Sequence, residues 1–189
     1  VSAGIHMPDS QYAIIGRPQV EQLAVGPIVA DHRRTILYAP TFEGYYEESN
    51  YSSLERMGPE MIRSILTELP DVRIIFKPHP ASGVQRPGMA QARVEIVEML
   101  AAANNGHLYV GPEASITLYE CFDAADALIS DISSVVTDYL YTERPLITSN
   151  PRELDPATYY NTFPTQRASY ILEKDLSNLS AILTDALGT

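Results

Sequence analysis

Two residues with side chains that could hold a charged ligand follow a short apolar segment of the chain. Lys77 and His79 stand in a Lys-Pro-His-Pro sequence directly after residues 73–76, and the prolines restrict the backbone there. Because side chains alternate along an extended segment, Lys77 and His79 are expected on the same side. Such a pair suits the stabilisation of phosphate charge, with the histidine available as a proton donor. A strand-ending turn with a solvated lysine explains the same sequence equally well.

A second polar segment follows the apolar residues 127–130. Ser133 and Ser134 open a predicted helix, where unpaired N–H groups and the serine hydroxyls could bind an anion. Serine is also a preferred helix N-cap, and the local sequence favours that interpretation. The two are compatible, because one serine can cap while neighbouring amides bind phosphate. Asp138, one turn further on, could accept hydrogen bonds from a ligand hydroxyl such as that of a ribose, although most exposed helical aspartates have no such role.

These residues form one site only if the fold brings the ends of separate segments together. From residue 35 onward, short β-rich segments alternate with longer helical ones. This alternation predicts βαβ crossovers and a single doubly wound, Rossmann-like α/β domain with a parallel sheet. Ligands of such sheets bind outside the carboxyl ends of the strands. We therefore expect Pro40 and Thr41, which follow the first predicted strand, at the same edge as the Lys-His and Ser-Ser sequences.

Apolar spacing and capping residues predict the individual elements. The predicted strands are 36–41, 73–79, 107–110, 127–130 and 145–149, with a weaker one at 12–16. The predicted helices are 59–69, 90–104, a short one from a Ser115 cap to residue 122, 135–141 and 176–187. The helix over 90–104 is expected to bury Val94, Val97, Leu100 and Ala101, with Gly106 as its C-cap. Segments 43–53 and 150–170 remain unassigned, and residues 1–34 are expected to be a lead-in to a domain of residues 35–189.

The composition argues against several classes of function. The 189 residues carry a net charge of −11, which disfavours nucleic acid as the main partner because phosphate backbones reward clustered Lys and Arg. The single cysteine, Cys121, cannot form an internal disulfide, so we expect a cytoplasmic protein. The sequence has no metal-ligand spacing, no dinucleotide or P-loop fingerprint and no membrane-spanning stretch. We therefore expect neither a metal nor a cofactor.

In three stretches the chain resembles the CDP-glycerol glycerophosphotransferases, the polymerases and primases of bacterial teichoic acids. The matching sequences are ILYAPTF at 36–42, KPHP at 77–80 and ADALISDISSVVTDYLYTERPLI at 125–147. The sequence IIGRPQVEQL at 14–23 is similar to a degraded form of that family's G-x-P-R-x-D-x-L segment. The SDxSSVxxDY pattern downstream of KPHP is the most specific part of the resemblance.

The resemblance implies the C-terminal, donor-binding half of a GT-B fold, in which two Rossmann-like domains flank a cleft. It also implies transfer of glycerol phosphate from CDP-glycerol to a poly(glycerol phosphate)-like chain: an acceptor hydroxyl attacks the glycerol-bearing phosphate and CMP leaves. Lys77 and His79 are then the candidate catalytic pair, because they would offset charge on the departing CMP. The residues implied to line the donor site are Arg17, Pro40, Thr41, Lys77, His79, Ser133, Ser134 and Asp138.

The chain departs from the family pattern in several places. It lacks the upstream W-H-G-T-P stretch that carries the family's general-base histidine, Ile132 replaces a tyrosine, and Thr137 replaces an aromatic residue. Arg17 precedes Pro18 instead of following a proline. Another CDP-alditol or a related nucleotide-activated group therefore stays open as the donor. We expect a piece of a larger protein that binds donor without turnover, its missing part contacting a lipid-linked polyol-phosphate acceptor and the inner face of the membrane.

Two other functions stay open. One is a UDP-sugar transferase or epimerase built on the same half-fold, which would prefer UDP to CDP ligands. The other is a non-enzymatic interaction domain that binds another protein through the acidic, tyrosine-rich segment 43–53, with Tyr45, Tyr46 and Tyr51 as its contacts.

Overall fold

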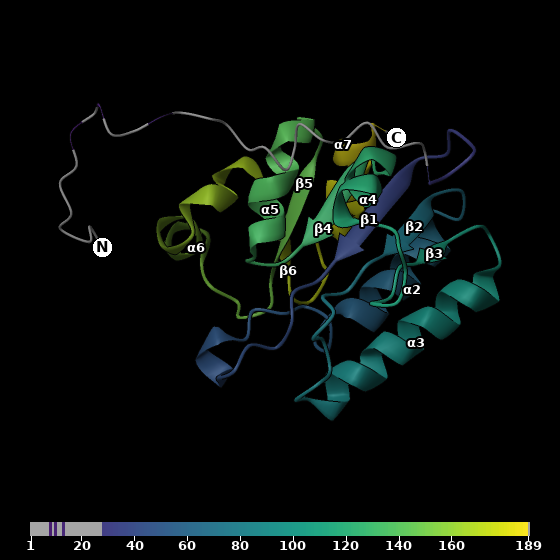
Figure 1. Ribbon diagram of the computed structural model, residues 1–189, viewed down its shortest axis with the longest axis horizontal. Helices are drawn as coiled ribbons and strands as arrows, with labels where there is room; N and C mark the ends of the chain where they lie inside the picture. The colour runs from purple at the N-terminus through teal and green to yellow at the C-terminus, as the bar shows by residue number, and fades with distance from the viewer. Residues whose placement is uncertain (1–7, 9, 11–12, 14–27, 189) are drawn as a thin grey trace.

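Six parallel strands form one sheet in the computed structural model, which describes residues 8, 10, 13 and 28–188 (Figure 1). The strand order is β3-β2-β1-β4-β5-β6, and every neighbouring pair is parallel. The doubly wound α/β prediction is confirmed. The strands are β1 (Thr35–Ala39), β2 (Arg73–Phe76), β3 (Leu108–Tyr109), β4 (Ala127–Ser130), β5 (Leu146–Asn150) and β6 (Tyr170–Glu173).

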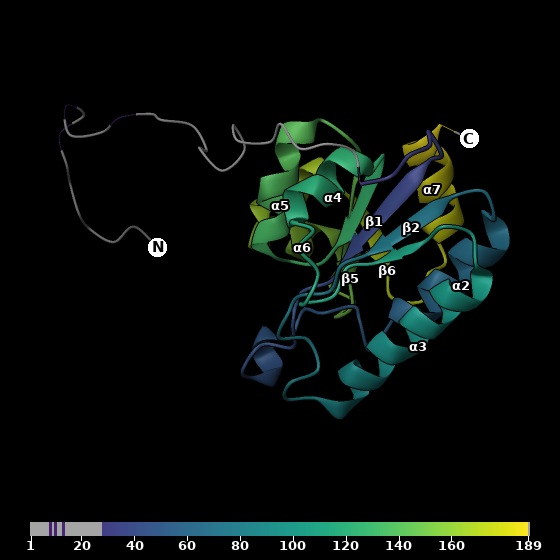
Figure 2. The ribbon, with the colours of Figure 1, turned by 45° about the vertical axis from the view of Figure 1, so that its right-hand side comes forward.

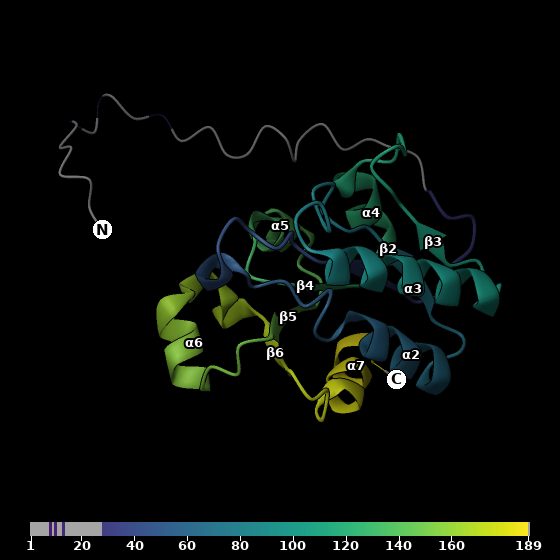
Figure 3. The ribbon, with the colours of Figure 1, turned by 90° about the horizontal axis from the view of Figure 1, so that it is seen from below.

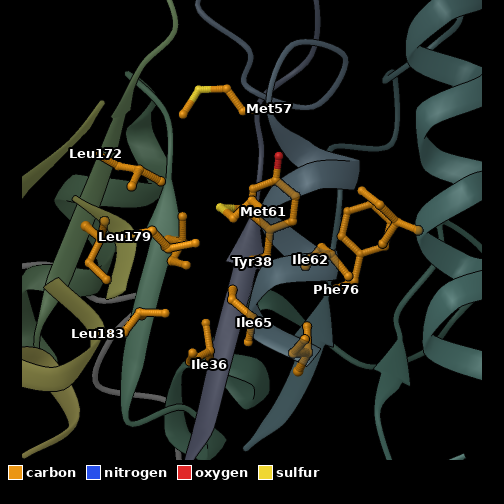
Figure 4. Packing of buried hydrophobic residues seen from close by; sticks show 14 of the residues in the cluster. Ile36, Tyr38, Met57, Met61, Ile62, Ile65, Phe76, Leu172, Leu179 and Leu183 are labelled. Atoms are coloured by element: carbon orange, nitrogen blue, oxygen red, sulfur yellow. The ribbon is translucent and has the colours of Figure 1, made fainter. Parts of the chain in front are cut away.

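Helices cover both faces of the sheet, as Figure 3 shows from below. One face packs against α2 (Gly58–Glu68), α3 (Pro87–Ala103) and α7 (Leu179–Leu187), and the other against α4 (Leu118–Ala124) and α5 (Ser134–Tyr139). Side chains alternate along β1, so Ile36 and Tyr38 join the first core and Leu37 and Ala39 the second. Figure 4 shows the first core, where Met61 and Ile62 of α2 lie next to Tyr38 of β1. Both faces being buried explains why the strands are continuous apolar runs.

Several helix boundaries and faces differ from the sequence predictions. The N-cap of α4 is Thr117 rather than Ser115, since its hydroxyl accepts from the Glu120 N–H at 3.2 Å. Helix α3 ends at Ala103 with Asn104 in the left-handed region, so Asn104 and not Gly106 caps it. Its buried residues are Met89, Ala92, Ile96 and Leu100, whereas Val94 is exposed. Because apolar residues lie on several faces of this helix, their spacing did not indicate which face is buried.

The segments left unassigned contain regular structure. Residues 150–170 contain α6 (Pro156–Thr162) and the 3-10 helix η4 (Pro164–Ala168), and they lead into β6. Segment 43–53 contains the 3-10 helix η2 (Glu47–Ser49), and η3 (Leu140–Thr142) follows α5 directly. Helix α7 starts at Leu179 rather than 176, since Leu176 lies in the left-handed region. The weak strand prediction at 12–16 lies outside the described residues.

The strand order reverses between β1 and β4, because the chain crosses from β3 at one edge back to the middle of the sheet. At such a switch point the loops after the two strands diverge and leave a crevice. The segment between β1 and α2, which carries η2, extends beyond the sheet (Figure 2). The fold thus places the ends of β1, β2 and β4 around one crevice.

Candidate functional site

A pocket of about 480 Å³ lies at the carboxyl ends of β1, β2 and β4. Residues after all three strands line it, and the N-terminal residue of α4 completes the wall. The parallel arrangement of the strands predicted that these residues converge at one edge of the sheet, and the structure confirms it. The lining residues are Ala39, Pro40, Thr41, Phe42, Lys77, Pro78, His79, Pro80, Leu118, Ser133, Ser134 and Val135.

Backbone hydrogen bonds hold two of these segments together beyond the ends of the strands. The N–H of Lys77 donates to the Tyr38 carbonyl at 2.9 Å, and the N–H of His79 donates to the Pro40 carbonyl at 3.1 Å. The pairing of β1 with β2 therefore continues to the rim of the pocket. Pro78 and Pro80 have no N–H to extend it. The Lys-Pro-His-Pro sequence is thus a paired extension of β2 rather than a solvated turn.

Lys77 is partly buried at the pocket wall, where its ammonium Nζ donates to the Ile116 carbonyl at 3.0 Å. An ammonium group has three donors, so one contact leaves two for a ligand. The hydrogen bond to Ile116 links Lys77, which follows β2, to the segment just before α4. A cation anchored in this way can neutralise a phosphate without first losing much side-chain freedom.

His79 lies at the outer rim of the pocket. Its Nδ1 accepts from the Ala81 N–H at 3.1 Å, so the neutral ring carries its proton on Nε2. Burial lowers the pKa of His79, and the nearby Glu43 carboxylate opposes this only in part. The neutral imidazole is therefore favoured at pH 7, with the Nε2–H free to donate to an oxygen in the pocket.

Ser133 occupies the N-cap position of α5, yet its hydroxyl makes no capping hydrogen bond. The Oγ atom is buried and has no hydrogen-bond partner among the described residues. A buried hydroxyl without a partner is costly. The capping role that the local sequence favoured is thus not what this side chain does. Ser134 is exposed at the same rim.

The structure brings together six of the eight residues expected at the donor site. Pro40, Thr41, Lys77, His79, Ser133 and Ser134 all line the pocket. Asp138 is half-buried on α5 and is not among the lining residues. Arg17 lies outside the described residues, as does the degraded motif at 14–23.

Sequence reasoning missed two buried carboxylates beside the pocket. Asp131 is fully buried and accepts hydrogen bonds from three separate segments. Glu43, only 2% exposed, accepts from the N–H groups of Gly83, Gln85 and Arg86 at 2.8–3.1 Å. The sequence leaves segment 43–53 unassigned, and the structure shows that its first acidic residue, Glu43, is buried. Neither set of contacts has a local signal, since the partners lie 18 to 90 residues away.

Burial acts on these two carboxyl groups with different results. Burial raises the pKa of Asp131 to about 6, although the hydrogen bonds from Ser149, Ser53 and Thr41 oppose it. At Glu43 burial also raises the pKa, but the backbone donors outweigh it and the pKa is lowered overall. Glu43 is therefore ionised at pH 7 and ties the segment after β1 to that after β2.

The tyrosine-rich segment is not a uniform exposed patch. Tyr45 and Tyr46 are 75% and 76% exposed. Tyr51, by contrast, packs edge-on against Phe163, and the Arg152 guanidinium lies 5.1 Å from its ring centre. Tyr51 therefore anchors the segment to the region after β5, and only two of the three tyrosines are free for a partner.

Neither a metal site nor a membrane-spanning helix is found among the described residues. Among residues 28–188, no group of three or more His, Cys, Asp or Glu side chains could hold a metal ion. No helix in the described part of the chain is both long enough and apolar enough to cross a membrane.

Solved structures with similar folds come from several carbohydrate enzymes. A protein assigned as a UDP-N-acetylglucosamine 2-epimerase from Listeria monocytogenes has a TM-score of 0.54 over 94% of this chain, at 15% identity. The N-terminal domain of a Candida albicans trehalose-6-phosphate phosphatase scores 0.54 over 83% at 13% identity, and a UDP-forming trehalose-phosphate synthase from Burkholderia vietnamiensis scores 0.53 over 82% at 12% identity. These likenesses show the fold, a Rossmann-like α/β domain. The chain spans only 34–41% of the length of these three proteins.

Sequence comparison gives the family directly. No curated protein matches the chain significantly. The family model described as CDP-Glycerol:Poly(glycerophosphate) glycerophosphotransferase, however, matches residues 21–162, which is three quarters of the chain. The match includes the ends of β1, β2 and β4 and every residue that lines the pocket. The chain belongs to the CDP-glycerol:poly(glycerophosphate) glycerophosphotransferase family.

Proposed function

We propose that the pocket at the ends of β1, β2 and β4 binds CDP-glycerol, the donor of a glycerophosphotransferase. The observation that carries this proposal is the convergence of Lys77, His79 and Ser133 in the lining of one pocket, where the Ser133 hydroxyl has no hydrogen-bond partner in the described part of the chain. Donors of these three kinds suit a diphosphate, which presents several anionic oxygens close together. The net charge of −11 does not oppose this, because a few local donors decide the binding of a small anion.

The proposed reaction is transfer of glycerol phosphate to a poly(glycerol phosphate)-type acceptor. An acceptor hydroxyl oxygen bonds to the phosphorus that bears glycerol, and the bond from this phosphorus to the bridging oxygen of the diphosphate breaks. CMP leaves with that oxygen and its electron pair, while the hydroxyl proton passes to a base. Lys77 neutralises charge on the leaving phosphate, and the Nε2–H of His79 donates to the same group.

We propose that this chain is one half of a larger enzyme. The complete enzyme would contain a second α/β half that supplies the general base and binds a lipid-linked acceptor. The donor-binding half would then bind CDP-glycerol without turning it over. We place the enzyme in the cytoplasm, peripherally at the inner membrane face, where a lipid-linked acceptor would be reached.

A ligand-induced thermal shift tests the donor. At a ligand concentration of 100 Kd the stabilisation is about 2.7 kcal/mol, which raises the Tm of a domain of this size by several degrees. CDP-glycerol and CMP should produce this shift. Lys77→Ala should reduce it, measured relative to the variant's own Tm. Lys174→Ala is the matched control, because Lys174 is the chain's other lysine and pairs with Glu153 outside the pocket.

The outcomes separate the remaining functions. A larger shift with UDP ligands than with CDP ligands would point to a UDP-sugar transferase or epimerase. No shift with either nucleotide, together with partner capture that depends on Tyr45 and Tyr46, would favour an interaction domain. A shift that survives Lys77→Ala unchanged would contradict the proposed site.

A further inference from the structure

Asp131 connects three segments that are distant in the sequence. Its Oδ2 accepts from the Thr41 N–H at 2.8 Å, and its Oδ1 accepts from the Ser53 N–H at 3.1 Å and the Ser149 hydroxyl at 2.5 Å. The residue is fully buried and does not line the pocket. It therefore acts on a ligand only through the groups that it holds.

The peptide groups of Thr41 are held at both ends. While Asp131 accepts from the Thr41 N–H, the Ser52 hydroxyl donates to the Thr41 carbonyl at 2.8 Å. Thr41 and the preceding Pro40 line the pocket. These two hydrogen bonds set the position of the wall that follows β1.

The same aspartate lies close to the opposite wall. Ser133 follows it by two residues and lines the pocket, and the buried Ser133 hydroxyl has no hydrogen-bond partner among residues 28–188. On the far side, the Ser149 hydroxyl donates to Asp131, and the Ser149 carbonyl accepts from the Tyr159 hydroxyl at 3.1 Å. The turn after β4 is thus fastened to the segment after β1 and to β5 through a single carboxyl group.

We infer that Asp131 is a positioning residue of the pocket: its carboxyl group sets the separation between the Pro40–Thr41 wall and the Ser133–Ser134 wall. The inference rests on the proposed function only for the name of the ligand. A displacement of about 1 Å between groups that bind one ligand is enough to weaken binding strongly. Loss of the Thr41–Asp131 hydrogen bond releases one wall from the other.

The chain offers a matched control at the other end of the same strands. Asp126 directly precedes β4, and its Oδ2 accepts from the Thr35 N–H at 2.8 Å. Asp126 and Asp131 thus lie at the two ends of β4. Asp126 accepts a hydrogen bond from the N–H of Thr35 at the start of β1, and Asp131 accepts one from the N–H of Thr41 just beyond the end of β1. Substitution of Asp126 removes a comparable carboxylate–backbone hydrogen bond at the end of β4 that lies away from the pocket. A comparison of the two variants therefore shows whether Asp131 only stabilises the fold or also positions the pocket walls.

The experiment measures the Kd of three probes, CDP-glycerol, UDP-glucose and inorganic pyrophosphate, by calorimetry at a temperature where circular dichroism shows each variant folded. In Asp131→Asn, one of the two backbone N–H groups faces an amide NH₂ that cannot accept. We expect its Kd for the probe that binds wild type to rise about tenfold or more. Ser52→Ala should weaken binding in the same way, since it frees the other end of the Thr41 peptide. Asp126→Asn should lower the Tm and leave the Kd unchanged.

Each outcome supports or overturns the positioning role of Asp131. If Asp131→Asn and Ser52→Ala both bind with wild-type Kd, the inference is overturned, and if Asp131→Asn does not fold, Ser52→Ala decides alone. If Asp126→Asn weakens binding as much as Asp131→Asn, the effect is general destabilisation and the inference fails. If wild type binds only UDP-glucose or pyrophosphate and Asp131→Asn loses that binding, the proposed donor is wrong and the positioning role stands. Absence of binding with all three probes overturns both.

Discussion

The ring of Phe42 stacks on the ring of His79, with centroids 4.9 Å apart and planes inclined by 29°. The contact joins the segment after β1 to the segment after β2 at the mouth of the pocket. Phe42 also meets Tyr45 edge-on at 5.9 Å. The imidazole is therefore held between an aromatic face and the Ala81 N–H, which fixes its orientation and keeps it neutral.

The affinity for CDP-glycerol should increase as the pH falls below the ordinary histidine range. Burial lowers the pKa of His79, so the ring is neutral at pH 7, and an anionic ligand favours the protonated form. Calorimetric titrations from pH 8 to pH 5.5 should show tighter binding at the acidic end. His79→Gln should flatten that dependence, and an identical pH profile in both proteins would exclude His79 from the ligand contact.

Ser133→Ala should raise the stability of the unliganded protein by about 1 kcal/mol, because it removes a buried hydroxyl that makes no capping hydrogen bond. Thr117→Ala is the contrasting cap, since the Thr117 hydroxyl accepts from the Glu120 N–H; its loss should cost about 1 kcal/mol. Urea unfolding measures both values. The same Ser133→Ala protein should show a reduced thermal shift with CDP-glycerol, and a full shift would remove Ser133 from the site.

Asp131 should make the protein less stable as the pH rises from about 4 to 6. Burial raises the pKa of Asp131 from 3.8 to about 6, so the folded state binds a proton that the unfolded state has already released. The stabilisation is complete below pH 4 and is lost as the pH rises through 6, by a few kcal/mol. The stability difference between wild type and Asp131→Asn, followed by urea unfolding, should change across this window. A constant difference would mean that Asp131 titrates normally.

Glu43 should show the opposite pH dependence. Burial raises its pKa, but the N–H groups of Gln85, Gly83 and Arg86 lower it more, so the ionised form is favoured on folding. Its contribution is present above pH 4.5 and is lost as the pH falls through the lowered folded pKa. Glu43→Gln should cost about 1–3 kcal/mol at pH 7, because an amide cannot accept all three bonds. Wild type and variant should converge on acidification, and parallel curves would contradict this assignment.

Much of the fold followed from local sequence patterns. The apolar runs that became β1, β2, β4 and β5 were visible because both faces of a parallel sheet are buried. The strand β6 was missed, since its sequence YILE begins with an exposed tyrosine and ends with a half-buried glutamate at the sheet edge. On α3 the apolar residues did not single out one face, so only packing against α2 decided that Ile96 is buried and Val94 exposed.

For the site, the sequence by itself determined which polar residues follow each strand: Thr41, Lys77, His79, Ser133 and Ser134. It could place them together because the carboxyl ends of parallel strands meet at one edge. Only the tertiary structure decided that the Ser133 hydroxyl is buried without capping α5, that Asp138 is not among the residues lining the pocket, and that Asp131 and Glu43 hold its walls. These are hydrogen bonds and burial between segments far apart in the chain, and their free energy depends on a geometry that no local pattern of residues specifies.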